Sequence, residues 1–174
     1  MPRQLKAQDS QIFRTMTPSL EKMTRSDWVT LCDDRLKQRG TTNFSALEIC
    51  DVGRTAYGVA LGAPPIEKLG NAFKLIEVLE WVRRADGVAP LLVNSWYRDP
   101  EYNETIGGVS HSMHITLGAA DIVKVGWSPS DVADLIDDSP WKKQLGLGRY
   151  NSFTHVDVRG MIGRPAPARW GTNG

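Results

Sequence analysis

Apolar side chains recur at helical spacing over residues 65–84, in the middle of the chain. The apolar stripe consists of Ile66, Leu69, Phe73, Ile76, Leu79 and Val82. Charged residues occupy the opposite side and Pro65 suits a first helical turn, so the segment predicts an amphipathic helix. An earlier helix is predicted from Ser26, a residue type that favours N-caps, to a stop at Gly40.

Beyond Pro90 the apolar residues fall into short runs that favour strands. The predicted strands cover residues 91–94, 119–125, 145–150 and 153–159. Asn151 and Ser152 separate the last two strands, and this spacing predicts a hairpin.

Two short helices are expected among these strands. One is centred on residues 102–103 and stops before the glycines at 107–108. The other begins at Ser128, which forms a capping box with Asp131, and runs to about Asp138.

The order of the elements predicts an α+β fold. Residues 41–64 mix Gly, Thr and Pro with short apolar pieces, which predicts an irregular connection, and the tail from Arg164 is expected to be extended. Helices come first and strands follow, with short links that favour antiparallel pairing. We therefore expect a small antiparallel sheet with helices packed on one of its faces.

The length of 174 residues is enough for one domain with an additional arm. The polar segment 1–25 is expected to form an N-terminal arm, and residues 26–174 are expected to form a single domain.

Charge and hydropathy exclude several classes of protein. Lys and Arg total 21 against 20 Asp and Glu, so the charge balance does not favour nucleic acid as a partner. No run of 18 apolar residues occurs, so no transmembrane helix is predicted. The N-terminus lacks the apolar core of a secretory signal, and we expect synthesis in the cytoplasm.

Cysteine and histidine are scarce, which limits the chemistry available. Cys32 and Cys50 are expected to be reduced, partly buried thiols, with a disulfide between them as the alternative. The three histidines, His111, His114 and His155, have to supply any imidazole ligand or general base.

The last predicted strand combines histidine with acidic and basic residues. Because alternate side chains of a strand share a face, His155, Asp157 and Arg159 point one way. Val156 and Val158 point the other way, toward a core.

A second cluster contains His114 in a loop rich in Gly and Ser, followed by Asp121 in the next predicted strand. A turn between them brings both side chains toward one point. Imidazole and carboxylate groups bind zinc, and a catalytic zinc keeps three protein ligands and one open position. His114, Asp121 and His155 are therefore a candidate zinc site, although a His and an Asp at this spacing also occur without any metal.

Three motifs, in the same order, resemble those of the M15 metallopeptidases, the D-Ala-D-Ala carboxypeptidase and endolysin family related to the hedgehog fold. The matching segments are residues 94–103 (NSWYRDPEYN, similar to S-G-Y-R-S-x-x-Y-N), 112–121 (SMHITLGAAD, similar to S-x-H-x-x-G-x-A-x-D) and 153–159 (FTHVDVR, similar to V-H-x-D). The later pair Arg169-Trp170 also fits, and the resemblance spans about residues 65–170.

The resemblance implies a hedgehog/DD-peptidase-like fold and a zinc-dependent peptidase. Its substrates would be peptidoglycan stem peptides, cut as a carboxypeptidase or as an endopeptidase. His114, Asp121 and His155 correspond to the zinc ligands of the family.

Arg98 corresponds to the arginine that family members direct at the scissile carbonyl. Negative charge develops on that carbonyl oxygen during hydrolysis, and a fixed guanidinium stabilises it. A purely structural pairing of Arg98 with Asp99 or Glu101 is the alternative.

The chain departs from the family pattern at two positions. The family glycine three residues after the first ligand is replaced by Leu117. Many members carry an acidic general base three residues before the last histidine, where this chain has Ser152. Asp157 is therefore the candidate base, or else a partner that orients His155, and His111 is a reserve.

Three other functions remain as alternatives. Ser152 favours a catalytically weak or inactive M15-like module in a phage virion. A second alternative is a domain that binds D-amino-acid peptides without cutting them. A non-haem iron oxygenase is the third, although its second histidine usually follows the H-x-D motif and no histidine follows Asp157. The lack of a secretory signal fits a phage lysin or a virion component that acts on the cell wall.

Overall fold

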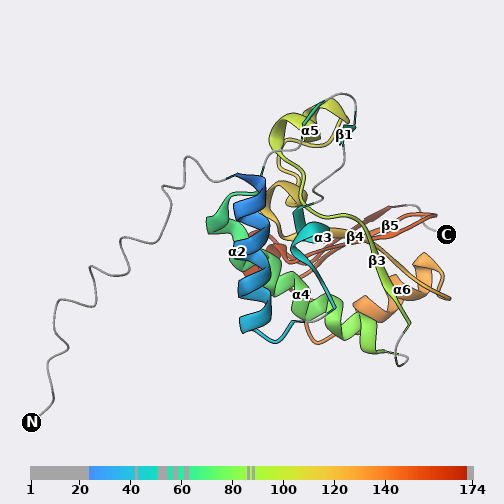
Figure 1. The fold of residues 1–174 in the computed structure, drawn as a ribbon. Helices are drawn as coiled ribbons and strands as arrows, with labels where there is room; N and C mark the ends of the chain where they lie inside the picture. The colour runs from blue at the N-terminus through green and yellow to red at the C-terminus, as the bar shows by residue number, and fades with distance from the viewer. Residues whose placement is uncertain are drawn as a thin grey trace, which may run out of the picture.

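The fold combines helices with a sheet, which confirms the α+β class expected from the sequence (Figure 1). The computed structural model describes residues 24–41, 43–50, 55–56, 59–60, 63–85, 87 and 89–171. The predicted N-terminal arm, residues 1–25, lies almost entirely outside the described residues. No helix in the described part of the chain is long and apolar enough to cross a membrane.

A five-stranded sheet with the order β3-β4-β6-β5-β7 lies at the centre of the fold. Its strands are β3 (Leu91–Ser95), β4 (Ala119–Lys124), β5 (Gly146–Arg149), β6 (Thr154–Asp157) and β7 (Ala168–Gly171). The first four are antiparallel neighbours, and β5 and β6 form the predicted hairpin.

The strand β7 differs from the sequence prediction. It pairs with β5 in the parallel direction, so the sheet is mixed and not purely antiparallel. The strand β6 returns the chain to the end of the sheet at which β5 begins, and the segment with the short helix η4 (Arg159–Ile162) passes this end to reach the start of β7. The sequence predicted only an extended tail, because a four-residue strand that follows two prolines has too little periodicity to detect.

The helices agree with the sequence prediction in position. They are α2 (Arg25–Gln38), η2 (Ile66–Lys68) leading into α4 (Leu69–Arg84), α5 (Pro100–Thr105) and α6 (Pro129–Asp137). The helix α2 begins after Thr24, not after Ser26, because the Thr24 hydroxyl and the Asp27 carboxylate form its capping box.

Residues 41–64 are more regular than predicted. They contain the helix α3 (Ala46–Cys50) and two short strands, β1 (Thr55–Ala56) and β2 (Val59–Ala60), which pair with each other. A five-residue helix is too short for its apolar spacing to be recognised in the sequence. It is stabilised by burial of Ala46, Ile49 and Cys50.

Alternation along the strands gives the sheet two different faces. On the first face, Lys124 donates to the Val82 carbonyl of α4 and the Thr154 hydroxyl donates to the Pro129 carbonyl of α6. Val156, which shares this face of β6, is fully buried. Asp121 and His155 alternate with these residues and lie on the second face. The helices α4 and α6 therefore cover one face, and the polar residues gather on the other.

The capping box of α6 gives a test of how this helix is stabilised. Ser128 accepts a hydrogen bond from the Asp131 amide, and Asp131 accepts in return from the Ser128 amide. Replacing Ser128 by Ala should lower the free energy of unfolding by about 1 kcal/mol. The melting temperature should then fall by about 2–4 °C. Ser130→Ala, at an exposed position in the same turn, is the control and should change little. Equal losses in the two variants would contradict a role for the cap.

Candidate metal centre

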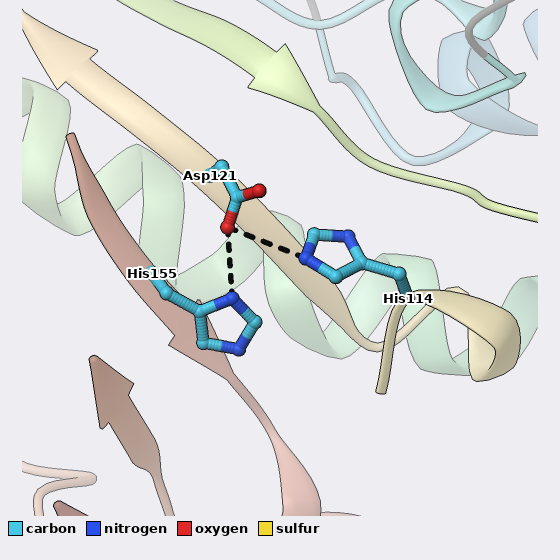
Figure 2. A group of neighbouring side chains, drawn as sticks. All are labelled: His114, Asp121 and His155. Carbon is cyan, nitrogen blue, oxygen red and sulfur yellow. Dashed lines mark hydrogen bonds and ion pairs between the residues drawn. The ribbon is translucent and has the colours of Figure 1, made fainter. Parts of the chain in front are cut away.

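Three potential metal ligands meet on the face of the sheet that α4 and α6 leave uncovered. His114 lies in the short helix η3 (Met113–Thr116), Asp121 in β4 and His155 in β6. One ligand atom from each lies within 4.8 Å of the other two, and all three residues are buried (Figure 2). The structure thus brings together the three residues that the sequence singled out.

Strand register places two of these residues side by side. Asp121 is directly opposite His155 in the antiparallel ladder between β4 and β6. Side chains at paired positions of neighbouring strands share a face and lie about 5 Å apart at their Cβ atoms. The Asp121 Oδ1 atom lies 2.8 Å from Nδ1 of His155 as a result.

The third residue, His114, is held by the buried Trp96. The Trp96 indole donates to the Leu117 carbonyl, and the Trp96 carbonyl lies 2.6 Å from Nδ1 of His114. Leu117 adopts a left-handed conformation with φ of 62°, which ends η3 and turns the chain into β4. A glycine would adopt this conformation freely, whereas a leucine in this conformation lowers the stability of the fold by about 1–2 kcal/mol. Complete burial of the Leu117 side chain offsets this loss.

The hydrogen bond to Trp96 determines which nitrogen of His114 carries a proton. A carbonyl oxygen only accepts, so Nδ1 of His114 is protonated in the neutral ring and Nε2 has the free lone pair. That Nε2 lies 3.3 Å from the Asp121 carboxylate. A lone pair and a carboxylate oxygen repel each other unless a cation or a proton lies between them. The residues present therefore fit a bound metal ion.

His155 has a second carboxylate behind it. Its Nε2 lies 3.3 Å from Oδ2 of Asp157, which is completely buried. Arg159 donates to both oxygens of Asp157, at 2.9 Å from Nε and 2.7 Å from Nη2. A carboxylate in this position accepts a hydrogen bond from a protonated Nε2 of His155, and Nδ1 then has a free lone pair that faces Asp121.

The electrostatics of the cluster set the protonation of its members. Burial alone would raise the pKa of Asp121, but the contacts with His114 and His155 outweigh it and hold that pKa well below its usual range. Burial lowers the pKa of His114, although Asp121 opposes the shift. An ionised carboxylate and a neutral imidazole are the forms that bind metal ions.

His155 responds in the opposite direction. Burial would lower its pKa, but the contacts with Asp121 and Asp157 outweigh burial and raise it. A metal ion at this imidazole therefore competes with a proton, and its affinity should increase with pH.

Arg98 lies beside the cluster. Its Nη2 is 2.6 Å from Oδ2 of Asp121, and its Nε donates to the Ser95 hydroxyl. The Arg98 side chain is 20% exposed. It therefore combines a fixed position with access to the adjacent cavity.

A cavity of about 640 Å³ opens over the cluster. Besides the three candidate ligands, its lining includes Arg98, His111, Tyr150, Phe153 and Trp170. The rings of Tyr150 and Phe153 are stacked at a centroid distance of 4.5 Å and form an aromatic wall. This wall was not predicted from the sequence, although Phe153 was expected to share a strand face with His155.

The cysteines lie in the core. Cys32 and Cys50 are both buried thiols. Burial raises the pKa of Cys32 to about 12, so its thiolate form is suppressed and it is unsuited to act as a nucleophile.

The comparison with known proteins agrees with this geometry. A family model described as Peptidase M15 matches residues 43–157, which include all three candidate ligands and Arg98. None of the curated proteins matches the chain.

A bound ion should stabilise the folded protein. At an ion concentration of 100 times Kd, the free energy of unfolding should rise by about 2.7 kcal/mol. For a domain of this size the melting temperature should then increase by about 5–10 °C. Melting curves with zinc and with a chelator measure this shift.

Two histidine variants make the melting experiment specific. His155→Ala should lose the zinc-dependent shift, whereas His111→Ala, which changes the histidine outside the cluster, should retain it. A shift of equal size in the wild type and in His155→Ala would rule out the cluster as its origin.

Proposed function

Because the chain belongs to the M15 family of peptidases, which makes it a metallopeptidase, we propose that it is a zinc enzyme that hydrolyses peptide bonds in peptidoglycan stem peptides. It would act as a carboxypeptidase or as an endopeptidase. We further propose that it acts on the cell wall as a phage lysin or as a virion component.

One observation carries the assignment of zinc. Two imidazoles and one carboxylate offer ligand atoms within 4.8 Å of one another, and the Nε2 lone pair of His114 faces the Asp121 carboxylate. Three protein ligands of this kind, with one position left open, are typical of catalytic zinc. When bound there, zinc would acidify a water molecule and polarise the substrate carbonyl.

Arg98 supports the proposal as the group that stabilises developing charge. Peptide hydrolysis converts the carbonyl oxygen into an oxyanion, and donors already in place stabilise it most effectively. The Arg98 guanidinium is held by Ser95 and Asp121 at the cavity wall. The substrate carbonyl would lie between Arg98 and the open position of the cluster.

The proton of the attacking water requires a base. Asp157 is poorly suited to this role, since it is completely buried and both its oxygens accept hydrogen bonds. Burial would raise the pKa of Asp157, but its contacts with His155 and Arg159 outweigh burial and lower it. We therefore assign to Asp157 the role of orienting His155.

His111 is the better candidate for the base. It is exposed and lines the same cavity. An imidazole nitrogen of His111 would take the proton from the water and return it to the leaving amine. The hydroxyl group of the water forms a bond to the carbonyl carbon, the C–N bond breaks, and the proton held by His111 passes to the amine that leaves.

A catalytically inactive module with the same site is the second candidate function. Ser152 supports it, because this exposed residue stands where many family members have an acidic base. A measurement of peptide cleavage distinguishes the active peptidase from the inactive module.

The direct test is digestion of purified peptidoglycan fragments with zinc present, followed by mass spectrometry of the products. The wild type should release new peptides, and His155→Ala should release none. Arg98→Gln should lower kcat by about 10²-fold, as expected for the loss of one oxyanion donor. Arg84→Gln, an exposed arginine on α4, is the matched control. Metal binding without any product from the wild type would favour the inactive module.

The two roles assigned to His111 and Asp157 are separable. His111→Ala should lower kcat by about 10²-fold or more and leave zinc affinity unchanged. Asp157→Asn should weaken zinc binding by about 10-fold or more. Kinetics over a range of pH and zinc titration measure the two effects. An Asp157→Asn variant with normal zinc affinity and no turnover would identify Asp157 as the base instead.

A further inference from the structure

The strand β5 carries glycine at both positions that face the metal centre. Gly146 pairs with Asp157, and Gly148 pairs with His155 on one side and with Trp170 on the other. His155, Gly148 and Trp170 therefore form one row across three neighbouring strands.

These glycines leave a slot across β5 that other side chains fill. A Cβ atom on Gly148 would lie 2.7 Å from Nε1 of Trp170, which is too close for real atoms. A Cβ atom on Gly146 would overlap the Asp157 carboxylate. Glycine within a strand often marks such a close approach. The slot therefore admits the Trp170 indole from β7 and the Asp157 carboxylate from β6.

Trp170 is in contact with two members of the site. Its ring lies 5.2 Å from the His155 ring, measured between centroids. The Arg159 guanidinium carbon lies 4.9 Å from the centroid of the Trp170 ring, which is within the range of a cation–π interaction. The indole N–H also donates to the Tyr150 hydroxyl at 3.0 Å.

These contacts form a continuous chain that ends at a proposed ligand. Trp170 packs on Arg159, and Arg159 donates to both oxygens of Asp157. Asp157 in turn lies 3.3 Å from Nε2 of His155. The guanidinium donates to the carboxylate through its planar fork and has its central carbon over the indole ring, so it is held on two sides.

We propose that Trp170 is a positioning residue, which holds His155 in its metal-binding orientation through Arg159 and Asp157. The inference rests on the proposed function, since it takes His155 as a metal ligand. The strand β7 would thus complete the metal centre from outside the segment 43–157 that the family model matches. The competing explanation is that Trp170, which lines the cavity, contacts the substrate directly.

Two substitutions that keep an apolar side chain distinguish these roles. Trp170→Phe retains an aromatic face for Arg159, whereas Trp170→Leu retains apolar volume without that face. Each protein is stripped of metal and titrated with cobalt(II) against a chelator, and the visible absorption of bound cobalt reports the ligand geometry. Trp170→Leu should bind cobalt about 10-fold more weakly, with an altered spectrum. Trp170→Phe should remain within about threefold of the wild type, because phenylalanine also attracts a guanidinium.

Two further variants keep the result interpretable. Trp141→Leu is the control, because it makes the same substitution at a tryptophan that packs against Trp81. It should leave cobalt binding unchanged. Gly148→Ala displaces the indole without changing Trp170 itself, and it should weaken cobalt binding as Trp170→Leu does.

Two results would overturn the inference. The first is wild-type cobalt affinity and spectrum in Trp170→Leu together with a raised KM for peptides, which would make Trp170 a substrate contact. The second is equal weakening by Phe and Leu, which would exclude the aromatic face as the cause. A wild type that binds no cobalt would instead contradict the proposed function itself, which separates the two failures.

Discussion

A buried carboxylate shared by two imidazoles is the constraint on which the rest of the site depends. Asp121 is 5% exposed, and burying an ionised group is unfavourable unless it is paired. Its Oδ1 atom is in contact with both His155 and His114, and its Oδ2 atom is in contact with Arg98. The backbone fixes both imidazoles beside this carboxylate. The β4–β6 register places His155 opposite Asp121, and the Trp96 carbonyl accepts a hydrogen bond from the ring of His114.

The sheet separates stability from chemistry by the alternation of its strands. Every second residue of a strand faces α4 and α6 and contributes to the core, as Ile122 and Val156 do. The residues between them point to the opposite face, which lies under the cavity and contains the polar cluster. Substitutions on the two faces should therefore have different consequences, with loss of packing on one face and loss of metal binding or turnover on the other. The glycines of β5 belong to the second group, since they make room for the groups behind His155.

Much of the fold and of the site was predictable from the sequence. The apolar stripe predicted α4, the capping box at Ser128 predicted α6, and the resemblance to M15 motifs placed His114, Asp121 and His155 in one cluster. These features depend on local spacing or on motifs that contain the site residues themselves.

The features that were not predicted depend on long-range packing. Examples are the parallel pairing of β7, the short helix α3 and the buried Lys124, which donates to two carbonyls at the end of α4. A lysine in a strand is normally expected to reach solvent, and only the approach of α4 explains its burial. The contacts of Trp170 with Arg159 and His155 likewise require the parallel pairing of β7 with β5.

Anomalous diffraction at the zinc edge, from crystals of the protein grown with zinc, would locate the bound ion and its ligands. We expect one strong peak bonded to Nε2 of His114, an Asp121 carboxylate oxygen and Nδ1 of His155, with Nε2 of His155 directed at Asp157. A zinc peak bound elsewhere, or His155 turned away from the ion, would contradict this expectation.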